Sequence, residues 1–321
     1  AARRRALAAR IGRRLGALVV VLSLPLAVAG AFVAMPLPAS LLDRGPVSSV
    51  VVLDRAGEPL MAAPSAEGQR SFPLERVPEH LRTALLAAED QRFFTHPGVD
   101  VRALVRAAKD SLLAGRVVSG ASTITQQLAR RLVPRPRSLL GKLGEALWAL
   151  RLEAHLDKER ILLEYANRVP LGRGTVGIEA ASRAHFGRPA HALSLGESAL
   201  LAGLAHAPAR EDPRRFPERA LARRDSVLLR ARAHALIDDD ALAAARAEPL
   251  DAAPPSRERA DTDLALHFVQ RAQRLAPRGA TVIETTLDRE LQRKVERIVD
   301  NELGELSERR VGQAAVLVLD N

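Results

Sequence analysis

The feature that most constrains this chain is an apolar run from Leu15 to Leu42, which contains no charged side chain and follows an arginine-rich segment. A helix needs about 20 apolar residues to cross a bilayer, and the basic flank of such a helix stays in the cytoplasm. We therefore predict a cytoplasmic basic tail over residues 1–14 and an uncleaved, single-pass anchor over residues 15–42. Everything after Asp43 should then lie outside the inner membrane, in a periplasmic or extracellular position.

A cleaved signal peptide is the alternative, because Ala27–Ala29 resembles a cleavage site. The apolar run is longer than the roughly 7–15 residues of a usual signal core, and this length favours the anchor. A buried core helix fits less well, since Pro25, Pro36 and Pro38 interrupt the run and a basic segment precedes it.

The composition narrows the class of partner. The chain has 321 residues, a formal net charge of +10, no cysteine and only 3% aromatic residues. So much positive charge suits a polyanionic partner. Few aromatic side chains are available to stack on bases, so anionic lipid headgroups or a pyrophosphate substrate fit better than nucleic acid. The lack of cysteine excludes a disulfide framework, a thiolate metal site and a cysteine nucleophile.

Two polar clusters, Glu89–Gly98 and Gly120–Gln127, lie at the ends of apolar helices. Leu81, Leu85 and Ala88 recur at helical spacing, so the first helix should end at Glu89. Asp100 is a good N-cap for a second helix that ends at Gly115. Its predicted apolar face consists of Val101, Leu104, Val105, Ala108 and Leu112.

A third helix should begin after Ser122, which we predict as its cap. Ile124, Leu128 and Leu132 would face inward, which leaves Thr123, Gln126, Gln127 and Arg130 on the polar side. Carboxylates at a helix end, facing hydroxyl and amide side chains, suit a wet, concave site for a polyhydroxylated substrate. The alternative is an ordinary helix terminus with a solvated acidic pair.

These clusters resemble the first two motifs of the family 51 glycosyltransferases, the peptidoglycan polymerases at the N-terminus of class A penicillin-binding proteins. The family pattern E-D-x-x-F-x-x-H-x-G is matched by Glu89, Asp90, Phe93, His96 and Gly98. The pattern G-G-S-T-I-T-Q-Q is matched from Gly120 to Gln127, with Ala121 in place of the second glycine. Residues 51–55, 118–123 and 167–170 look most like the penicillin-binding protein 1C branch.

The family's third motif, R-K-x-x-E, falls in a predicted helix over residues 139–155, whose buried face should carry Leu143, Leu147, Leu150 and Ala154. Lys142 and Glu145 match its last two positions, while Gly141 stands where the family has arginine. Either a nearby arginine such as Arg137 covers the lost charge or activity is reduced. The basic stretch over residues 134–137 is either a surface loop or a segment that touches the membrane interface.

The resemblance implies that the chain polymerises lipid II into β-1,4-linked glycan with inversion, releasing polyprenyl pyrophosphate. Glu89 would be the general base and Glu145 a second catalytic carboxylate, which could hold Mg²⁺ or Mn²⁺ near the pyrophosphate. No organic cofactor is implied. The implied substrate-binding residues are Asp90, Phe93, His96, Gly120, Ser122, Thr123, Gln126, Gln127, Arg130, Arg137 and Lys142, with His96 holding the loop together rather than moving protons.

The remaining segments carry little chemistry. Residues 48–57 predict a strand or small hairpin. The G-x-G-x-x-G stretch Gly172–Gly177 follows a helical pattern rather than a strand, which argues against a nucleotide fold and favours a tight loop lining the cleft. His185, His191 and His206 lack ligand spacing and are predicted to be structural or surface groups. A helix over Phe216–Ala247 precedes a proline-rich linker.

The end of the chain predicts a strand over residues 280–286, a helix capped by Asp288 up to Leu303 and a strand over residues 313–319. In the family, such an arrangement opens the transpeptidase domain. Neither S-x-x-K nor K-T-G occurs in this sequence, so the acylation motifs are absent from these residues.

We therefore predict a mainly α, lysozyme-like, two-lobed domain over residues 67–216. A membrane-proximal strand and linker would occupy residues 43–66, a helical and proline-rich linker residues 217–279, and an incomplete α/β piece residues 280–321. A lytic glycan-cleaving enzyme and a catalytically weakened membrane scaffold are the alternatives. The expected partners are lipid II, the growing strand and other cell-wall synthesis proteins, and not nucleic acid.

Overall fold

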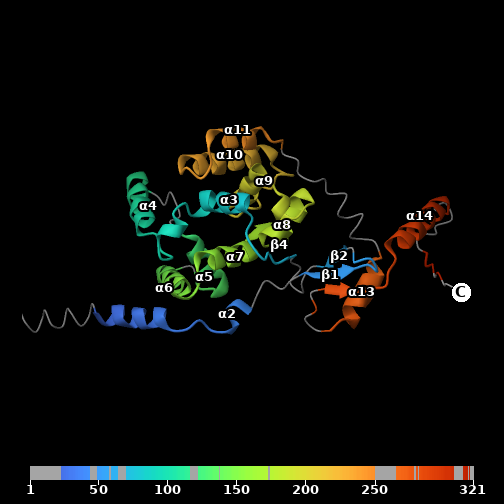
Figure 1. Ribbon diagram of the computed structural model, residues 1–321, viewed down its shortest axis with the longest axis horizontal. Coiled ribbons are helices and arrows are strands. Elements are labelled where there is room, and N and C mark those ends of the chain that lie inside the picture. Colours follow the sequence, from blue (N-terminus) through green and yellow to red (C-terminus); the bar gives the residue numbers. More distant parts are fainter. Residues whose placement is uncertain are drawn as a thin grey trace, which may run out of the picture.

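The computed structural model describes residues 23–43, 49–57, 59–63, 70–115, 122–136, 138–172, 174–249, 265–277, 280, 282–306, 314–316 and 318. This part of the chain is mainly helical, as predicted (Figure 1). The principal helices are α3 (Glu79–Glu89), α4 (Val101–Ala114), α5 (Ile124–Leu132), α6 (Leu139–His155), α7 (Lys158–Arg168), α8 (Ile178–Phe186), α9 (Leu195–Leu204), α10 (Pro217–Ala233), α11 (Asp239–Ala247), α13 (Leu266–Leu275) and α14 (Arg289–Glu305). Short helical turns are α2 (Ser40–Asp43), η1 (Phe93–Thr95) and η2 (Ala190–Ala192).

Side-chain caps set where several helices begin. Asp100 accepts a hydrogen bond from Ala103 N and caps α4, as predicted. The cap of α5 is Thr123 and not Ser122: the Thr123 hydroxyl accepts from Gln126 N, and the Gln126 side chain returns a bond to Thr123 N. This reciprocal box requires Glu or Gln three residues after the cap, and only Thr123 has one. The prediction of Ser122 was therefore wrong by one residue.

The main hydrophobic core joins two groups of helices. Helix α3 packs against α9 and α10, and α5 packs against α6 and α7. The fully buried side chains include Leu85 from α3, Leu128 from α5, Leu162 from α7 and Val227 from α10. This core therefore extends beyond residue 216, where the sequence placed the end of the domain. The predicted helix over Phe216–Ala247 is in fact two helices, α10 and α11.

Two helices present different faces from those predicted. Helix α6 has the predicted bounds, but Leu143 and Ala154 are exposed, while Glu145, Trp148 and Leu152 are buried. Leucines occur all around α6, so apolar spacing alone does not define its buried face; the ion pairs of Glu145 turn that face inward. Helix α4 has no buried residue, and its predicted apolar face is exposed.

The N-terminal segment lies against α6. Residues 23–34 are helical. The Phe32 ring meets the Trp148 ring edge to face at 5.3 Å, and Arg151 donates hydrogen bonds to the carbonyl oxygens of Met35 (3.0 Å) and Pro36 (2.5 Å). Among the described residues, no helix is long and apolar enough to cross a bilayer. Residues 15–22 of the expected anchor lie outside them, so the anchor stays a prediction.

A small sheet brings distant parts of the chain together. Strand β1 (Val50–Leu53) pairs antiparallel with β2 (Pro59–Ala63), as a hairpin should, and parallel with β5 (Val282–Glu284), in the order β2-β1-β5. Helix α13, which the sequence analysis missed, packs on β1. Helix α14 begins after its predicted cap, Asp288. The last predicted strand lies partly outside the described residues, and residues 314–316 are not in a strand.

The glycine-rich stretch forms a second, two-stranded sheet of β3 (Pro170–Gly172) and β4 (Thr175–Val176). Gly174 adopts φ 69°, a left-handed conformation that glycine accepts without strain. The hairpin contacts Arg70 through a bridge to Thr175. It is absent from the described lining of the cleft discussed below, so the expectation that it lines the cleft was wrong.

Candidate active site

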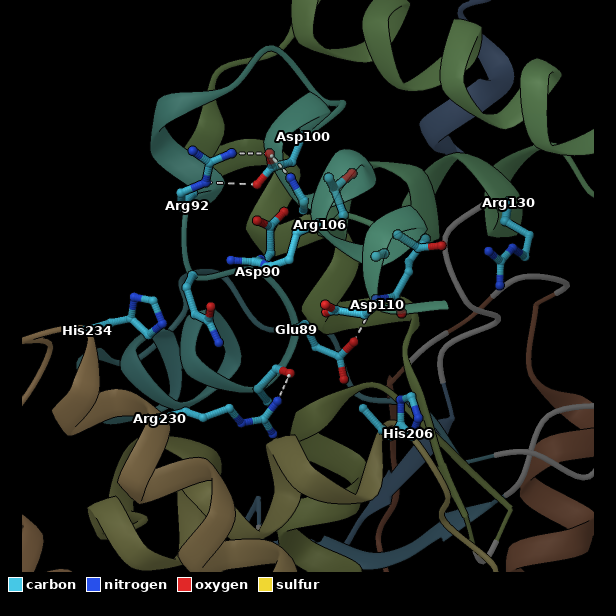
Figure 2. A pocket seen from close by; sticks show the side chains of 18 of the residues that line it. Glu89, Asp90, Arg92, Asp100, Arg106, Asp110, Arg130, His206, Arg230 and His234 are labelled. Carbon is cyan, nitrogen blue, oxygen red and sulfur yellow. Dashed lines mark hydrogen bonds and ion pairs between the residues drawn. The ribbon is translucent and has the colours of Figure 1, made fainter. Parts of the chain in front are cut away.

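A polar cleft of about 840 Å³ opens between α3, α4, α5 and α10 (Figure 2). Figure 2 shows Glu89 in the middle of this cleft, with Arg230 and His206 on one side and Arg106 and Asp90 on the other. Six arginines line it, namely Arg92, Arg106, Arg130, Arg131, Arg223 and Arg230. The described cleft therefore suits a ligand that carries both hydroxyl and anionic groups.

Glu89 is the last residue of α3, and its two oxygens have different surroundings. Oε2 accepts a hydrogen bond of 2.7 Å from Gln127 Nε2. Oε1 is buried and has no hydrogen-bond partner among the residues that the structure describes. A buried acceptor atom without a partner is costly unless a ligand or water supplies the donor. Glu89 thus has one oxygen held by Gln127 and a second, buried oxygen that has no partner among the described residues.

Two guanidinium groups flank Glu89. Arg230, from α10, donates to the carbonyl oxygen of Ala88 at 3.2 Å, and burial lowers the pKa of Arg230, an effect that the nearby charge of Glu89 opposes. Arg131, from α5, is also largely buried; desolvation lowers its pKa, while Tyr165 and Glu89 act in the opposite direction. Neither arginine was predicted from the sequence. Helix α10 follows Glu89 by more than a hundred residues, so no local motif points to Arg230.

Asp90 and His96 stabilise the loop that follows Glu89. Asp90 accepts hydrogen bonds from His96 Nε2 (3.0 and 3.1 Å) and from Ile124 N at the start of α5 (3.1 Å). His96 Nδ1 accepts from Gly98 N at 3.2 Å, so Nε2 is the nitrogen that carries the proton. Both side chains are buried. The geometry therefore gives His96 the loop-holding role that was expected, and Asp90 shares that role.

Glu145 forms the centre of a second charged cluster. It accepts hydrogen bonds from Arg130 Nε (2.7 Å), Arg130 Nη2 (3.0 Å) and Lys142 Nζ (2.8 Å). Burial alone would raise the pKa of Glu145, but the bonds from Arg130 and Lys142 outweigh this and hold it below its ordinary value. Glu145 therefore stays ionised and positions the two cations. Lys142 Nζ also lies 3.3 Å from Ser122 Oγ, which lines the cleft.

Both oxygens of Glu145 are occupied by cationic side chains in this structure. Both of its oxygens already accept hydrogen bonds from Arg130 and Lys142. Within the described ranges, no group of three or more histidine or acidic side chains could hold a metal. A divalent cation bound directly to Glu145 would have to displace Arg130 and Lys142 from its oxygens. One carboxylate together with substrate phosphates is a common Mg²⁺ environment, so a cation that accompanies the pyrophosphate stays a prediction.

Gly141, the departure from the family's third motif, lies under the preceding loop. A Cβ atom at this position would stand 2.0 Å from the carbonyl oxygen of Pro136. One turn further along α6, the side chain of Arg135 packs over Gly144, where a Cβ would lie 2.8 Å from Arg135 Nη1. The backbone carbonyl of Pro136 thus occupies the space that a longer side chain at position 141 would need.

The other predicted residues divide into three groups. Glu89, Asp90, Ser122, Thr123, Gln127 and Arg130 line the cleft. Phe93 is fully buried in the core, and Gln126 is buried in the cap of α5, so neither is in the cleft lining. Gly120 and Arg137 lie outside the described residues. Asp100, Asp110, His206 and His234 also line the cleft but were not predicted to do so; His206 had been assigned to a structural or surface role.

Comparison with known proteins identifies relatives. The model of the family described as Transglycosylase matches residues 56–232. Penicillin-binding protein 1C of Escherichia coli (strain K12) is 39% identical over 298 residues, which cover 92% of this chain and 37% of that protein. Penicillin-binding protein 1A of Aquifex aeolicus (strain VF5) is 38% identical over 235 residues, covering 72% and 32%. The chain thus spans about a third of the length of these curated relatives.

Among solved structures, penicillin-binding protein 1A from Haemophilus influenzae has a TM-score of 0.43 and 21% sequence identity to this chain. The match covers 85% of this chain and 33% of that one.

Proposed function

The chain belongs to the transglycosylase family, the family 51 glycosyltransferases, and from this premise we propose that it polymerises lipid II into β-1,4-linked peptidoglycan strands. The observation that carries the proposal is Glu89 Oε1, a buried carboxylate oxygen without a partner among the described residues, in a cleft lined by arginines. Lipid II combines sugar hydroxyls with a pyrophosphate, and the cleft offers groups for both.

The proposed reaction is a single displacement at an anomeric carbon. Glu89 Oε1 takes the proton of the attacking 4-hydroxyl as that oxygen bonds to the anomeric carbon, and the bond from this carbon to the pyrophosphate oxygen breaks. The configuration therefore inverts, and polyprenyl pyrophosphate leaves with the bonding electron pair. A well-placed general base contributes roughly 10²–10⁴ in rate.

The leaving pyrophosphate needs charge neutralisation more than a proton, and Arg130 and Lys142 supply it. Glu145 holds both cations through its three hydrogen bonds. Because these groups are already in place before the reaction, little reorganisation is needed when negative charge develops. No step of this proposal uses a metal ion held by the protein.

Lytic cleavage of finished glycan is the weaker candidate. A glycan strand presents hydroxyl, amide and peptide groups but no pyrophosphate, which leaves the Arg130 and Lys142 cluster without a ligand of matching charge. The scaffold alternative rested on Gly141 and on the absence of the transpeptidase motifs. In this structure Gly141 lies under the Pro136 carbonyl, where a Cβ atom would clash, and this supports a role for the glycine in local packing.

We propose in addition that residues 15–42 anchor the chain in the inner membrane, with the cleft outside it. The apolar run and the basic tail before it support this assignment. An anchored chain should remain in the membrane fraction after alkaline carbonate extraction, and release by carbonate would argue against the anchor.

The decisive experiment is lipid II turnover by the full chain in detergent or vesicles, read as glycan ladders. Wild type should produce ladders, and Glu89→Gln should abolish them while still binding lipid II, because the amide cannot accept the proton. Glu159→Gln provides a matched control, since Glu159 is an exposed carboxylate that pairs with Arg82 and is absent from the described cleft lining. Ladders from Glu89→Gln would refute the assignment of the base.

A further inference from the structure

Glu89 is oriented by a chain of hydrogen bonds that ends in a residue outside the cleft lining. Gln127 donates from Nε2 to Glu89 Oε2 at 2.7 Å, and its other amide atom, Oε1, lies 3.3 Å from the Tyr165 hydroxyl. This series of hydrogen bonds links three separate helices, because Glu89 lies on α3, Gln127 on α5 and Tyr165 on α7. Tyr165 is fully buried.

The two partners of the Gln127 amide, Glu89 and Tyr165, require the same orientation of that amide. The Glu89 carboxylate can only accept, so it needs the amide nitrogen. The Tyr165 hydroxyl keeps its proton and therefore donates to the amide oxygen; burial, reinforced by the charge of Glu89, raises the Tyr165 pKa above its ordinary value. A flipped amide would place its oxygen against the carboxylate and its nitrogen against a donor.

Tyr165 itself is held firmly. Its ring packs in the core among α5 and α7, and the Arg131 guanidinium lies 5.8 Å from the ring centroid, within the range of a cation–π contact. The hydroxyl is therefore presented to Gln127 from a fixed position. With Oε2 of Glu89 occupied by Gln127, Oε1 is the oxygen left for the substrate hydroxyl.

We propose that Tyr165 is a positioning residue, which fixes the Gln127 amide and through it holds Glu89 with Oε1 free for the proton of the acceptor hydroxyl. The inference rests on the proposed function of Glu89 as the base. It assigns a catalytic consequence to a residue that the substrate does not touch, because Tyr165 is absent from the described cleft lining.

The test is Tyr165→Phe, which keeps the ring that Arg131 faces and removes the hydroxyl together with its interactions with Gln127 and Arg131. Without that hydroxyl the amide can turn, and the carboxylate loses its fixed donor. We expect kcat to fall about tenfold, in line with the loss of one hydrogen bond, while KM for lipid II changes less than about twofold.

A double-mutant cycle separates positioning from general damage to the fold. In a Gln127→Ala background, Tyr165→Phe should cause no further loss of kcat, because the connection to Glu89 is already cut. An equal loss of kcat from Tyr165→Phe in both backgrounds, or no loss of kcat in the single variant, would overturn the inference.

A second readout does not depend on activity. In protein labelled with ¹⁵N-glutamine, the signal that disappears in Gln127→Ala reports the Gln127 side-chain amide. This signal should shift and broaden in Tyr165→Phe, because the amide is no longer held in one orientation, and an unchanged signal would overturn the inference. If wild type produced no glycan ladders, the proposed function would be refuted. The amide signal would still test whether Tyr165 holds Gln127 beside Glu89.

Discussion

At the scale of single residues, the two glutamates of the site have opposite surroundings. Glu89 offers an oxygen without a partner among the described residues, whereas Glu145 accepts three hydrogen bonds from cations. Motif matching identified both residues, but their types and spacing could not separate a proton acceptor from a holder of cations. That distinction depends on what α5 places beside each carboxylate, which is a property of the packed structure.

Glu145→Gln should reduce glycan synthesis by at least about 10²-fold, because Arg130 and Lys142 lose the charge that positions them. It should also change the pH dependence of stability. The pKa of Glu145 is lowered on folding, so its contribution is present above the unfolded value of about 4.5 and disappears as pH falls through the lower folded pKa.

The measurement is chemical denaturation of wild type and Glu145→Gln across this acidic range. The difference in their free energies of unfolding should be constant near neutral pH and shrink below about pH 4.5. A difference that grows on acidification would contradict the assignment of an ionised Glu145.

Gly141→Ala should destabilise the protein by about 1–3 kcal/mol, because the added Cβ meets the Pro136 carbonyl oxygen and the loop must move. Gly304→Ala in α14 is the matched control: an added Cβ there meets no described atom within 4 Å. It should be neutral or stabilise by up to about 1 kcal/mol, the usual helical preference for alanine. Equal effects of both substitutions in thermal unfolding would contradict the crowding at Gly141.

At the scale of elements, helix ends were easier to predict than helix faces. The ends of α3, α4, α6 and α14 follow from caps and breakers within a few residues, such as Asp100 and Gly115 around α4. The buried face of α6 was predicted wrongly, because the leucines of α6 occur on all of its faces. Which face is buried depends on the partners that Trp148 and Glu145 find on other segments. Such partners lie far away in the chain and leave no local pattern.

Arg151 joins the N-terminal segment to α6. The Arg151 Cζ atom lies 4.7 Å from the centroid of the Phe32 ring and 4.8 Å from that of the Trp148 ring. Its guanidinium nitrogens donate to the carbonyl oxygens of Met35 and Pro36. Arg151→Lys keeps the charge but loses the planar fork that serves two carbonyls at once. We expect faster amide hydrogen exchange over residues 23–36 with little change in α9 and α10.

The control for Arg151 is Arg232→Lys, which alters an exposed pair with Asp239 and should leave exchange over residues 23–36 unchanged. If Arg151→Lys exchanged like wild type in this segment, the segment would have to be held by the aromatic contact alone.

At the scale of the whole molecule, the parallel pairing of β1 with β5 joins segments more than two hundred residues apart. Each strand was predicted separately from the sequence, but their pairing was not, because alternation within a strand carries no information about its neighbour. The missed helix α13 belongs to the same piece. Val52, Leu60 and Val269 form a hydrophobic cluster there that is separate from the main helical core.

Two separate cores predict two separable unfolding transitions, which can be tested with one pair of substitutions. Val269 in α13 and Val227 in α10 are both fully buried, the first in the small cluster and the second in the helical core. Val→Ala at either position removes two methyl groups and should cost about 1–3 kcal/mol. The two valines lie in different clusters and share no partners, so their effects should be independent. In differential scanning calorimetry, Val269→Ala should lower the midpoint temperature of one transition and Val227→Ala that of the other. A single transition that moves equally in both variants would mean that the sheet and the helical core unfold as one unit, and that the pairing of β1 with β5 stabilises the cleft as well as the ends of the chain.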